Sequence, residues 1–444
     1  MESIEFYDIT ETRLKRIAWL SSRDSNKEFH QLMHLFNEES LKVCFRELQG
    51  NKAIGTDGIS KSDYGSQLDE NIGDLVSRMK SMSYRPQAVR QVLIPKEGKV
   101  NAYRSLGVSC FEDKIIQRMT QKVLESIYEP LFLDCSYGFR PGRGCHDAVR
   151  KLYQYLFSNV VETVLDVDLS KYFSSIDHKE LEAILREKIK DKKFMRYIIR
   201  MFKAGTLSKD ELKVSDEGVV EGSMASPILS NIFAHYVIDQ WFENTVKKHC
   251  RGKADVFRYC DDMVVCCQYQ QDAERVKKAL AKRLARYKLK MNEDKTHYVG
   301  FSKILYRRGK SQGTFDFLGF KFYLGRSRNG IVIPKVRTSG SRIRSKLKKV
   351  NQWAKEIRNK YRLKQIWEMF CVKLQGHVRY YGVSFNDRGV NLFLDKAKIL
   401  MFKWLNRRSQ KRSFDWEKFN LFLLRNPLPK VKIYHKLFFN SPAR

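Results

Sequence analysis

The chain has 444 residues, with 84 Lys+Arg against 50 Asp+Glu, and its formal net charge is +34. Hydrophobic residues at 43% and aromatic residues at 12% can supply a sizeable core, which argues against intrinsic disorder. So large an excess of positive charge favours nucleic acid as the partner. No apolar run approaches the length of about 18 residues that a membrane-spanning helix needs, so we expect no membrane partner.

Cysteine usage and the start of the chain bear on its compartment. Nine cysteines without a CxxC pair favour reduced thiols over a disulfide framework or a zinc ribbon. The segment from Met1 to Glu11 is acidic and lacks the apolar stretch of a signal peptide. We therefore expect a cytoplasmic protein.

The positive charge is concentrated toward the C-terminus. Residues 326–444 carry 30 Lys+Arg and 6 Asp+Glu, which is +24 of the total +34. We predict an N-terminal extension over 1–50, a globular body over 51–325 and a basic domain over 326–444. The stretch from Tyr323 to Arg342 contains three glycines and Pro334, and we interpret it as a connector.

The apolar patterns predict both helices and strands. In chain order they indicate a helix over 38–48, a Gly-rich turn over 51–60, a strand over 91–95, a helix over 111–127, a strand over 160–169, a helix over 226–241, two short strands around a tight turn over 256–267, a strand over 315–323 and a helix over 343–357. Strands mixed with helices and followed by a helical basic region predict an α+β fold.

Carboxylates stand at two of the predicted strand ends. Asp168 ends the strand over 160–169, and Asp261 and Asp262 occupy the tight turn within 256–267. A strand-ending Asp and a solvated turn are the ordinary interpretations. Adjacent carboxylates repel each other, however, and need a counter-charge. Three Asp suffice for a paired Mg²⁺ site of the kind used in two-metal phosphoryl transfer, where one ion activates a 3′-hydroxyl and the other holds the triphosphate.

A series of short motifs in a fixed order extends this hypothesis. They are AIGTDGI at 53–59, IPK at 94–96, RSLG at 104–107, DCSYGFRPGRGCH at 134–146, DLSKYF at 168–173, DH at 177–178, GSMASPILSN at 222–231, YCDD at 259–262, NEDKT at 292–296 with FDFLGF at 315–320, and LQGHVRYY at 374–381. The series resembles reverse transcriptases of the group II intron type. The resemblance implies a right-hand polymerase, with fingers and palm over 51–325 and a helical basic thumb, or maturase-like domain, over 326–444.

The resemblance also implies roles for single residues. Asp168, Asp261 and Asp262 would be the catalytic metal ligands, for two Mg²⁺ ions that Mn²⁺ could replace. Lys96 and Arg104 would hold the triphosphate, although both could be plain basic surface residues.

Three further residues have implied roles near the nucleotide. Phe173 would be the gate that excludes a ribose 2′-hydroxyl, unless it is simply a core Phe. Gly222 would let template or nucleotide approach the backbone, and Lys295 would protonate the pyrophosphate, unless it only flanks a helix.

The basic tail is expected to bind the phosphates of a template–primer duplex. Ile343, Leu347, Val350, Ala354 and Ile357 form one apolar stripe, which leaves the cations on the other faces of the same helix. Those candidate nucleic-acid-binding residues are Arg342, Arg344, Lys346, Lys348, Lys349, Lys355 and Arg358. A solvated charged face is the alternative.

The chain departs from the family pattern at two places. Val220-Glu221-Gly222 stands where the family has PQG, so a carboxylate at Glu221 would lie near the triphosphate unless it points away or pairs with Lys or Arg. Cys260 replaces the usual Ala beside the metal site. No Cys/His pair follows Tyr381, so we expect no zinc-containing endonuclease.

We predict an RNA-directed DNA polymerase that copies a structured, cognate non-coding RNA into cDNA from deoxynucleoside triphosphates. The compact length and the YCDD box also resemble bacterial class 2 defence-associated enzymes, which would imply an antiphage role in the bacterial cytoplasm. Two alternatives stay open: a group II intron enzyme that supports splicing and mobility, and a non-catalytic RNA-binding maturase. The sequence gives no indication of protein partners.

Overall fold

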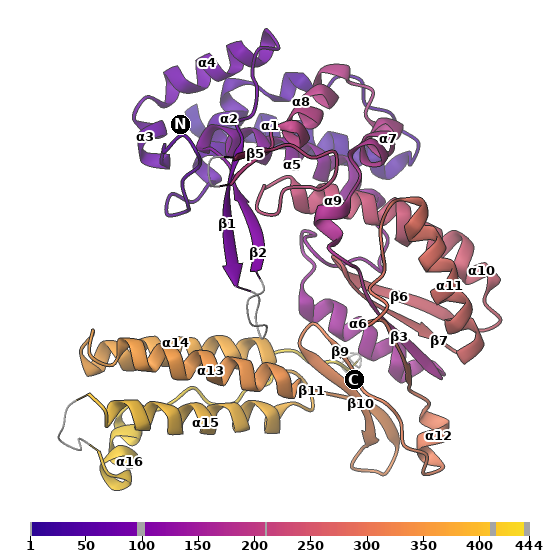
Figure 1. The fold of residues 1–444 in the computed structure, drawn as a ribbon, viewed down its shortest axis with the longest axis vertical. Helices are drawn as coiled ribbons and strands as arrows, with labels where there is room; N and C mark the ends of the chain where they lie inside the picture. Colours follow the sequence, from indigo (N-terminus) through magenta and orange to yellow (C-terminus); the bar gives the residue numbers. More distant parts are fainter. Residues whose placement is uncertain (1, 96–102, 209–210, 409–413, 439–444) are drawn as a thin grey trace. The chain divides into compact units, whose positions relative to one another are not determined.

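A computed structural model of the chain describes residues 2–95, 103–208, 211–408 and 414–438 (Figure 1). The chain forms two compact units that alternate along the sequence. The first comprises Met1–Gly144, Val167–Met263 and Glu274–Thr296, and the second comprises Cys145–Asp166, Val264–Ala273 and His297–Arg444. Among the described residues, no helix is both long and apolar enough to span a bilayer.

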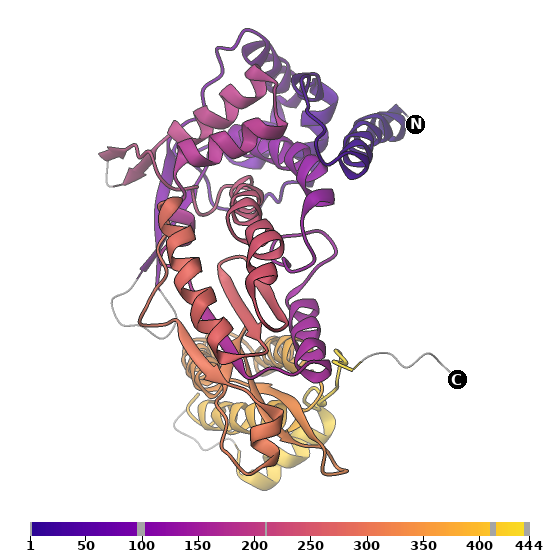
Figure 2. The same cartoon turned by 90° about the vertical axis from the view of Figure 1, so that its right-hand side faces the viewer.

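The first unit is largely helical. Its helices before residue 89 are α1 (Glu2–Arg23), η1 (Met33–Leu35), α2 (Glu38–Glu47), α3 (Lys61–Ser66) and α4 (Leu68–Lys80). Later helices include α5 (Phe111–Tyr128), η2 (Glu129–Leu131), η3 (Tyr172–Ser175), α7 (His178–Lys188), α8 (Lys192–Lys203) and most of α11 (Gln270–Arg286). Helix α1 packs against α5 (Figure 2). The helices predicted over 38–48 and 111–127 are confirmed as α2 and α5.

A long β-hairpin extends from these helices, as Figure 1 shows. Strand β1 (Val89–Pro95) pairs antiparallel with β2 (Tyr103–Val108), in a register that sets Ile94 opposite Arg104. Short strands β4 (Thr206–Ser208) and β5 (Glu211–Lys213) complete a sheet of order β2-β1-β4-β5. The pairing register fixes the position of Arg104 near the end of the hairpin.

A second sheet has the order β6-β7-β3-β8. Its strands are β6 (Ala254–Tyr259), β7 (Asp262–Cys267), β3 (Thr163–Asp168) and β8 (His297–Gly300). The two strands predicted over 256–267 are therefore confirmed, with Cys260 at φ +59° between them.

The helix predicted over 226–241 is longer than expected and contains two π-helical segments. It begins as α9 (Ser226–Ala234), continues through η4 (His235–Asp239) and η5 (Phe242–Val246), and ends with α10 (Lys247–His249). Pro227 lies in the first turn, where the missing N–H costs no hydrogen bond.

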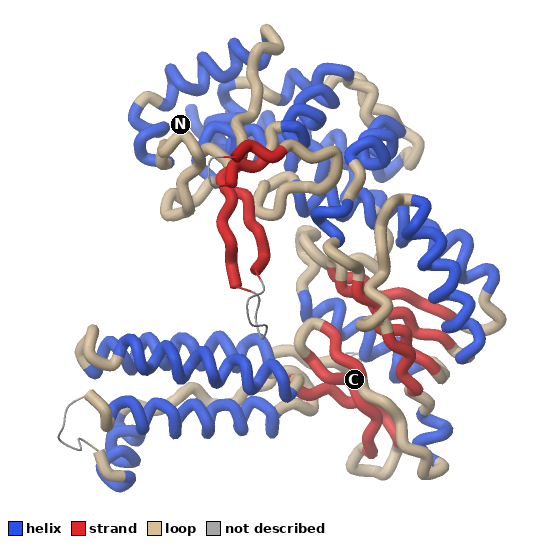
Figure 3. The backbone as a smooth tube through the Cα atoms, viewed as in Figure 1, coloured by secondary structure: helices blue, strands red, loops and turns tan. Residues whose placement is uncertain are grey.

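The second unit combines a three-stranded sheet of order β11-β10-β9 with helices (Figure 3). Its helices are α6 (Cys145–Ser158), α12 (Lys303–Arg307), α13 (Gly340–Ile357), α14 (Leu363–Tyr381), α15 (Asp387–Leu405) and α16 (Trp416–Arg425). Helices α13, α14 and α15 lie side by side in Figure 1.

Two predictions for this unit are wrong. The single strand predicted over 315–323 is a hairpin of β9 (Phe315–Phe317) and β10 (Phe320–Arg326), because Leu318 and Gly319 adopt left-handed φ values of +52° and +83°. The connector predicted between Tyr323 and Arg342 contains β11 (Val332–Thr338), which pairs with β10. Pro334 is tolerated there because β11 is an edge strand.

The apolar stripe predicted on the basic helix is confirmed in most of its positions. Ile343, Val350, Ala354 and Ile357 are buried on α13, whereas Leu347 is half-buried. Each buried Ile or Val side chain contributes on the order of 1.5–3 kcal/mol relative to exposure. This burial directs the cations of α13 away from the core.

Candidate active site

Asp168 is the last residue of β3, and its surroundings are basic. Its backbone carbonyl accepts a hydrogen bond from the N–H of Asn292 at 2.8 Å. Its carboxylate lies 2.7 Å from the Nζ atom of Lys295, and both side chains are partly exposed. The segment from Asn292 to Thr296 therefore brings the ammonium of Lys295 to the end of β3.

Asp261 lies in the turn between β6 and β7 and shares the electrostatic environment of Asp168. Burial raises the pKa of Asp261, and the charge of Asp168 raises it further, whereas Arg104 and Lys295 lower it. The structure thus brings together Asp168, Asp261, Arg104 and Lys295, four of the residues predicted from the sequence. Asp262 is the first residue of β7 and is partly exposed.

The turn is held by a buried arginine that the sequence analysis did not identify. The guanidinium of Arg258 donates from Nε to Oδ1 of Asp239 at 2.8 Å and from Nη2 to Oδ2 at 2.5 Å. Both side chains are at most 1% exposed. Arg258 also donates to the carbonyl of Cys260 at 3.1 Å and to Oγ of Ser136 at 2.7 Å. A charged residue inside an apolar strand, one position before Tyr259, was the available signal.

Gly138 lets a second segment contact the same turn. A Cβ atom at this position would clash with the backbone nitrogen and the thiol of Cys260. The carbonyl of Gly138 accepts a hydrogen bond from the side-chain amide of Asn231 at 2.6 Å. The motif over 134–146 and helix α9 therefore both support the turn that carries Asp261.

Arg104 pairs with the carboxylate that departs from the family pattern. Its Nε atom lies 3.1 Å from Oε2 of Glu221, and the two side chains are 57% and 25% exposed. The N–H of Gly107 donates to the carbonyl of Glu221 at 2.6 Å. Of the two alternatives for Glu221, the structure favours pairing.

Gly222 is required by contacts within the protein. It has φ +112°, and a Cβ atom there would clash with the carbonyl oxygen of Gly107. The close approach that its sequence position predicted is therefore an approach of strand β2. A contact of Gly222 with nucleotide or template stays a prediction.

Phe173 lies in η3 and is not a core residue. It is partly exposed, whereas the neighbouring Tyr172 is buried and donates from its hydroxyl to the carbonyl of Ser230 at 2.7 Å. Left-handed backbone at Lys171 (φ +48°) starts this short turn after β3. Phe173 therefore remains available for a gating role. Lys96, the other predicted triphosphate ligand, lies outside the described residues.

Mg²⁺ takes oxygen ligands, usually one or two carboxylates with water and substrate phosphates. Within the described ranges no group of three or more His, Cys, Asp and Glu side chains is assembled in a way that could hold a metal ion. Asp168 and Asp261 interact electrostatically, and the ammonium of Lys295 supplies positive charge beside Asp168. The charge of Asp168 raises the pKa of Asp261, and neighbouring carboxylates suit a hard cation. Metal binding by the three Asp stays a proposal.

The basic residues predicted on α13 have several different environments. Arg344, Lys348, Lys349 and Lys355 are exposed, as is Arg342. The ammonium of Lys346 lies 4.6 Å from the ring centre of Tyr381, and the guanidinium of Arg358 lies 4.9 Å from that of Trp404. Lys346 and Arg358 therefore also pack against aromatic side chains of the unit.

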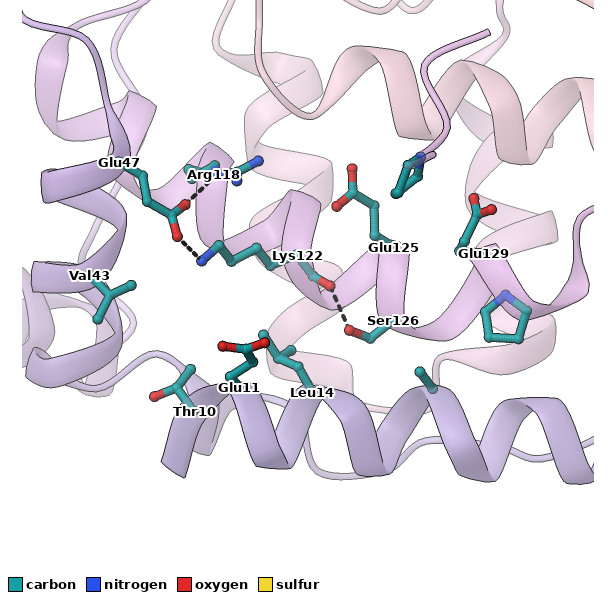
Figure 4. A pocket seen from close by; sticks show the side chains of 13 residues that line it. Thr10, Glu11, Leu14, Val43, Glu47, Arg118, Lys122, Glu125, Ser126 and Glu129 are labelled. Atoms are coloured by element: carbon teal, nitrogen blue, oxygen red, sulfur yellow. Dashed lines mark hydrogen bonds and ion pairs between the residues drawn. The ribbon is translucent and has the colours of Figure 1, made fainter. Parts of the chain in front are cut away.

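A cavity of about 600 Å³ lies among α1, α2 and α5, and none of the predicted site residues lines it (Figure 4). Its charged side chains are already paired in large part: Glu47 accepts from Arg118 at 2.9 Å and is also bonded to Lys122. Glu129 pairs with Arg140 at 2.8 Å. We therefore assign this cavity no role in the chemistry.

Comparison with known proteins gives consistent matches. A family model described as reverse transcriptase (RNA-dependent DNA polymerase) matches residues 94–322, more than half of the chain. The group II intron-encoded protein LtrA of Lactococcus lactis subsp. cremoris is 33% identical over 223 residues, covering 50% of this chain and 37% of LtrA. Protein YkfC of Escherichia coli (strain K12) is 30% identical over 362 residues, covering 72% of this chain and 90% of YkfC.

A eukaryotic relative matches a comparable region. The uncharacterized 91 kDa protein in the cob intron of Schizosaccharomyces pombe is 30% identical over 278 residues, covering 62% of this chain and 34% of that protein. This chain therefore matches about a third of the length of LtrA and of the yeast protein.

Proposed function

We propose that this chain, which belongs to the reverse transcriptase (RNA-dependent DNA polymerase) family, copies RNA into DNA by nucleotidyl transfer. The observation that carries the proposal is the grouping of Asp168 and Asp261 with Arg104 and Lys295. These residues come from β3, the β6–β7 turn, the β1–β2 hairpin and the segment before β8. The two carboxylates suit a metal ion, and the two cations suit the negative charge of a nucleotide triphosphate.

Each residue has a proposed task. Asp168, Asp261 and Asp262 would hold Mg²⁺, which when bound stabilises the charge that develops in phosphoryl transfer. The guanidinium of Arg104 would bind the triphosphate, for which its planar donors are well suited. Lys295 would neutralise the negative charge beside Asp168 and supply a proton to the leaving pyrophosphate. Phe173 would exclude a ribose 2′-hydroxyl.

The substrates and the biological role are finer proposals. We propose that a structured RNA is the template, that deoxynucleoside triphosphates are the substrates and that cDNA is the product. A cognate non-coding RNA and an antiphage role rest on the sequence resemblance alone, as does a bacterial cytoplasmic location. The intron-supporting role is the second candidate, because the names of LtrA and of the yeast protein place both in introns.

The test is primer extension on an RNA template by the double variant Asp261→Ala/Asp262→Ala. We expect loss of DNA synthesis, because the variant loses two of the proposed metal ligands, with RNA affinity close to that of the unmodified protein. The matched control is Asp69→Ala/Asp74→Ala, which removes two carboxylates that are 87% and 62% exposed on α4. Full extension by the Asp261/Asp262 variant would refute the assignment.

A second measurement separates the two candidate roles. A group II intron RNA that flanks the coding sequence should splice faster with the protein if the intron role is correct. If splicing is unaffected and one abundant cDNA species co-purifies with the protein, a dedicated template is supported instead.

A further inference from the structure

A cleft of about 730 Å³ in the second unit lies between the sheet β11-β10-β9 and the first turns of α13 and α15. Four basic residues line it: Lys321 on β10, Arg337 on β11, Arg344 on α13 and Arg388 on α15. We propose that this cleft binds backbone phosphates of the nucleic acid that the enzyme copies. The inference rests on the proposed function and deepens it by assigning three residues, Lys321, Arg337 and Arg388, that were not candidates before.

The charge of the cleft is incompletely compensated by the protein. The carboxylate of Asp316 pairs with Lys321 at 2.7 Å and accepts a hydrogen bond from Ser339 at 2.6 Å. Arg337, Arg344 and Arg388 are exposed, and none of them has an ion-pair partner among the described residues. Among the residues that line the cleft, one carboxylate, that of Asp316, stands against four cations. Asp387 adds a second negative charge near Tyr323, so an excess of positive charge remains. Like charges this close are stabilised when an anion lies between them.

The arginines converge although they come from three elements. The guanidinium of Arg337 lies 5.0 Å from the ring centre of Tyr323. The charges of both Arg337 and Arg388 lower the pKa of the Tyr323 phenol, although burial raises it on balance. Both guanidinium groups are therefore near the same ring. Arg337 on a strand and Arg344 and Arg388 on two helices present planar donors to the same cleft. Such donors match the geometry of phosphate better than the ammonium of lysine does.

The aromatic side chains of the cleft indicate what part of the nucleic acid is bound. The ring of Tyr323 lies beneath Arg337, and the ring of Phe385 packs against Tyr153 at 5.8 Å and Phe438 at 5.2 Å. Neither ring is therefore set up as a platform for an unpaired base. The cleft should recognise the backbone and be insensitive to base sequence. The first turn of α13 also borders the cleft and adds backbone N–H donors that suit phosphate.

The experiment measures nucleic-acid affinity of the full chain against salt concentration, using a single-stranded RNA and an RNA–DNA duplex. The cleft variant is Arg337→Gln/Arg344→Gln/Arg388→Gln. The matched control is Lys179→Gln/Lys192→Gln/Lys193→Gln, which removes the same charge from exposed positions on α7 and α8, outside the basic region. We expect the slope of log affinity against log salt to become shallower by about 2–3 in the cleft variant, because each lost phosphate contact accounts for about 0.7–0.9.

The two probes distinguish the sources of phosphate. A shallower slope on either probe, with little change in the control, supports the cleft and shows whether the template strand or the duplex occupies it. Equal slopes for the cleft variant and the control on both probes would overturn the inference. If the triple variant does not fold, Arg388→Gln alone should lower the slope by about one, and no change would overturn it equally.

The outcome is distinguishable from failure of the proposed function. If the cleft variant has a shallower salt dependence of affinity but extends primers normally at saturating template, both proposals are supported. If the unmodified protein makes no DNA but the slope still depends on the cleft, the polymerase assignment fails and the phosphate site stands.

Discussion

At the scale of single residues, the two neighbouring aromatic side chains of the short turn η3 have different environments. Tyr172 is buried and bonded to the chain, whereas Phe173 is partly exposed beside it with the rings 5.5 Å apart. Because Tyr172 anchors the turn, substitution of Phe173 should affect the site more than the fold. This separation makes the gating hypothesis testable.

We expect Phe173→Ala to lower the preference for deoxynucleotides over ribonucleotides by roughly 10- to 200-fold, the range that small steric differences in a pocket give. The measurement is single-nucleotide extension with each nucleotide type. Phe157→Ala, which shortens a 41% exposed ring on α6, is the control and should leave the preference unchanged. If Phe173→Ala also leaves it unchanged, Phe173 is not the gate.

Glu221 offers a second residue-scale prediction. Its carboxylate occupies one donor of Arg104, and it would repel an incoming triphosphate. Glu221→Gln keeps the size of the side chain and removes the charge. An exposed ion pair is worth up to about 1 kcal/mol, so we expect the KM for deoxynucleotide to fall by roughly fivefold with kcat nearly constant.

Steady-state extension with varied nucleotide measures this effect. The control is Glu182→Gln, which removes the carboxylate of an exposed pair on α7, Glu182 with Arg186. A lower kcat with unchanged KM in Glu221→Gln would contradict the interpretation. It would mean that Glu221 orients Arg104 for the reaction and does not compete for it.

The sequence motifs name the four charged residues that the structure groups at the end of β3, but not how these residues pair. Asp168, Asp261, Arg104 and Lys295 were all predicted, because their motifs are local. The pair of Arg104 and Glu221 joins residues more than a hundred positions apart, which no local pattern encodes. Arg258 was not predicted, because its acceptor Asp239 lies in a separate, largely apolar helical segment and no local pattern links the two residues.

At the scale of elements, Arg258 fastens β6 to the π-helical segment η4 that contains Asp239. Removing one partner of a buried ion pair leaves the other charge uncompensated. We expect Arg258→Met to lower the free energy of unfolding by about 3–5 kcal/mol, as measured by denaturant titration.

The double variant Arg258→Met/Asp239→Leu should recover much of that loss, because neither charge is then left buried and unpaired. Arg186→Met, which breaks an exposed pair with Glu182 at 2.8 Å, should cost less than about 1 kcal/mol. A cost for Arg258→Met as small as that of Arg186→Met would contradict the proposed support of the turn.

The hairpin between β9 and β10 depends on one glycine. Gly319 has φ +83°, and a Cβ atom there would lie 3.0 Å from the hydroxyl oxygen of Tyr381. We expect Gly319→Ala to destabilise the protein by about 1–2 kcal/mol in thermal or denaturant unfolding, because an L-residue is strained in this conformation.

The control for this substitution is Gly376→Ala. Gly376 lies inside α14, and a Cβ atom added there would meet no neighbouring side chain within 4 Å. Ala at this position should therefore be neutral or stabilising by up to about 1 kcal/mol. If Gly319→Ala proves as mild as Gly376→Ala, the left-handed turn is not what ends β9.

This hairpin also shows why one element was predicted wrongly. The segment FDFLGF has the composition of one strand, and only its Gly suggests a break. Leu318 gives no sign of its left-handed φ, because tertiary pairing of β10 with both β9 and β11 imposes it. The helices were predicted better, because their apolar periodicity is a local property.

At the scale of the whole molecule, the boundary of the basic region does not coincide with the boundaries of the two compact units. The basic region begins at Arg326, but this residue ends strand β10, and helix α6 (Cys145–Ser158) belongs to the same unit as the basic helices. The stack of His146 on His435, with ring centres 3.5 Å apart, is one contact that joins α6 to the C-terminal segment. Such contacts between distant segments do not appear in a charge profile.

The predicted family and fold class are confirmed: the chain is similar to group II intron proteins, and helices and strands combine in a reverse transcriptase domain with a helical C-terminal region. Ordered motifs made this possible, because each motif is short and their order is diagnostic. Biological role is not encoded in those motifs, since intron enzymes and dedicated-template enzymes share them. It therefore stays a proposal.

The most direct test of the central claim is templated incorporation of a single nucleotide by the full-length protein. A DNA primer is annealed to RNA, each deoxynucleotide is offered separately, and Mg²⁺ is either supplied or removed by a chelator. We predict incorporation of only the nucleotide complementary to the RNA, and only when Mg²⁺ is present. Absence of incorporation with Mg²⁺, or incorporation that ignores the template base, would contradict the assignment as an RNA-directed DNA polymerase.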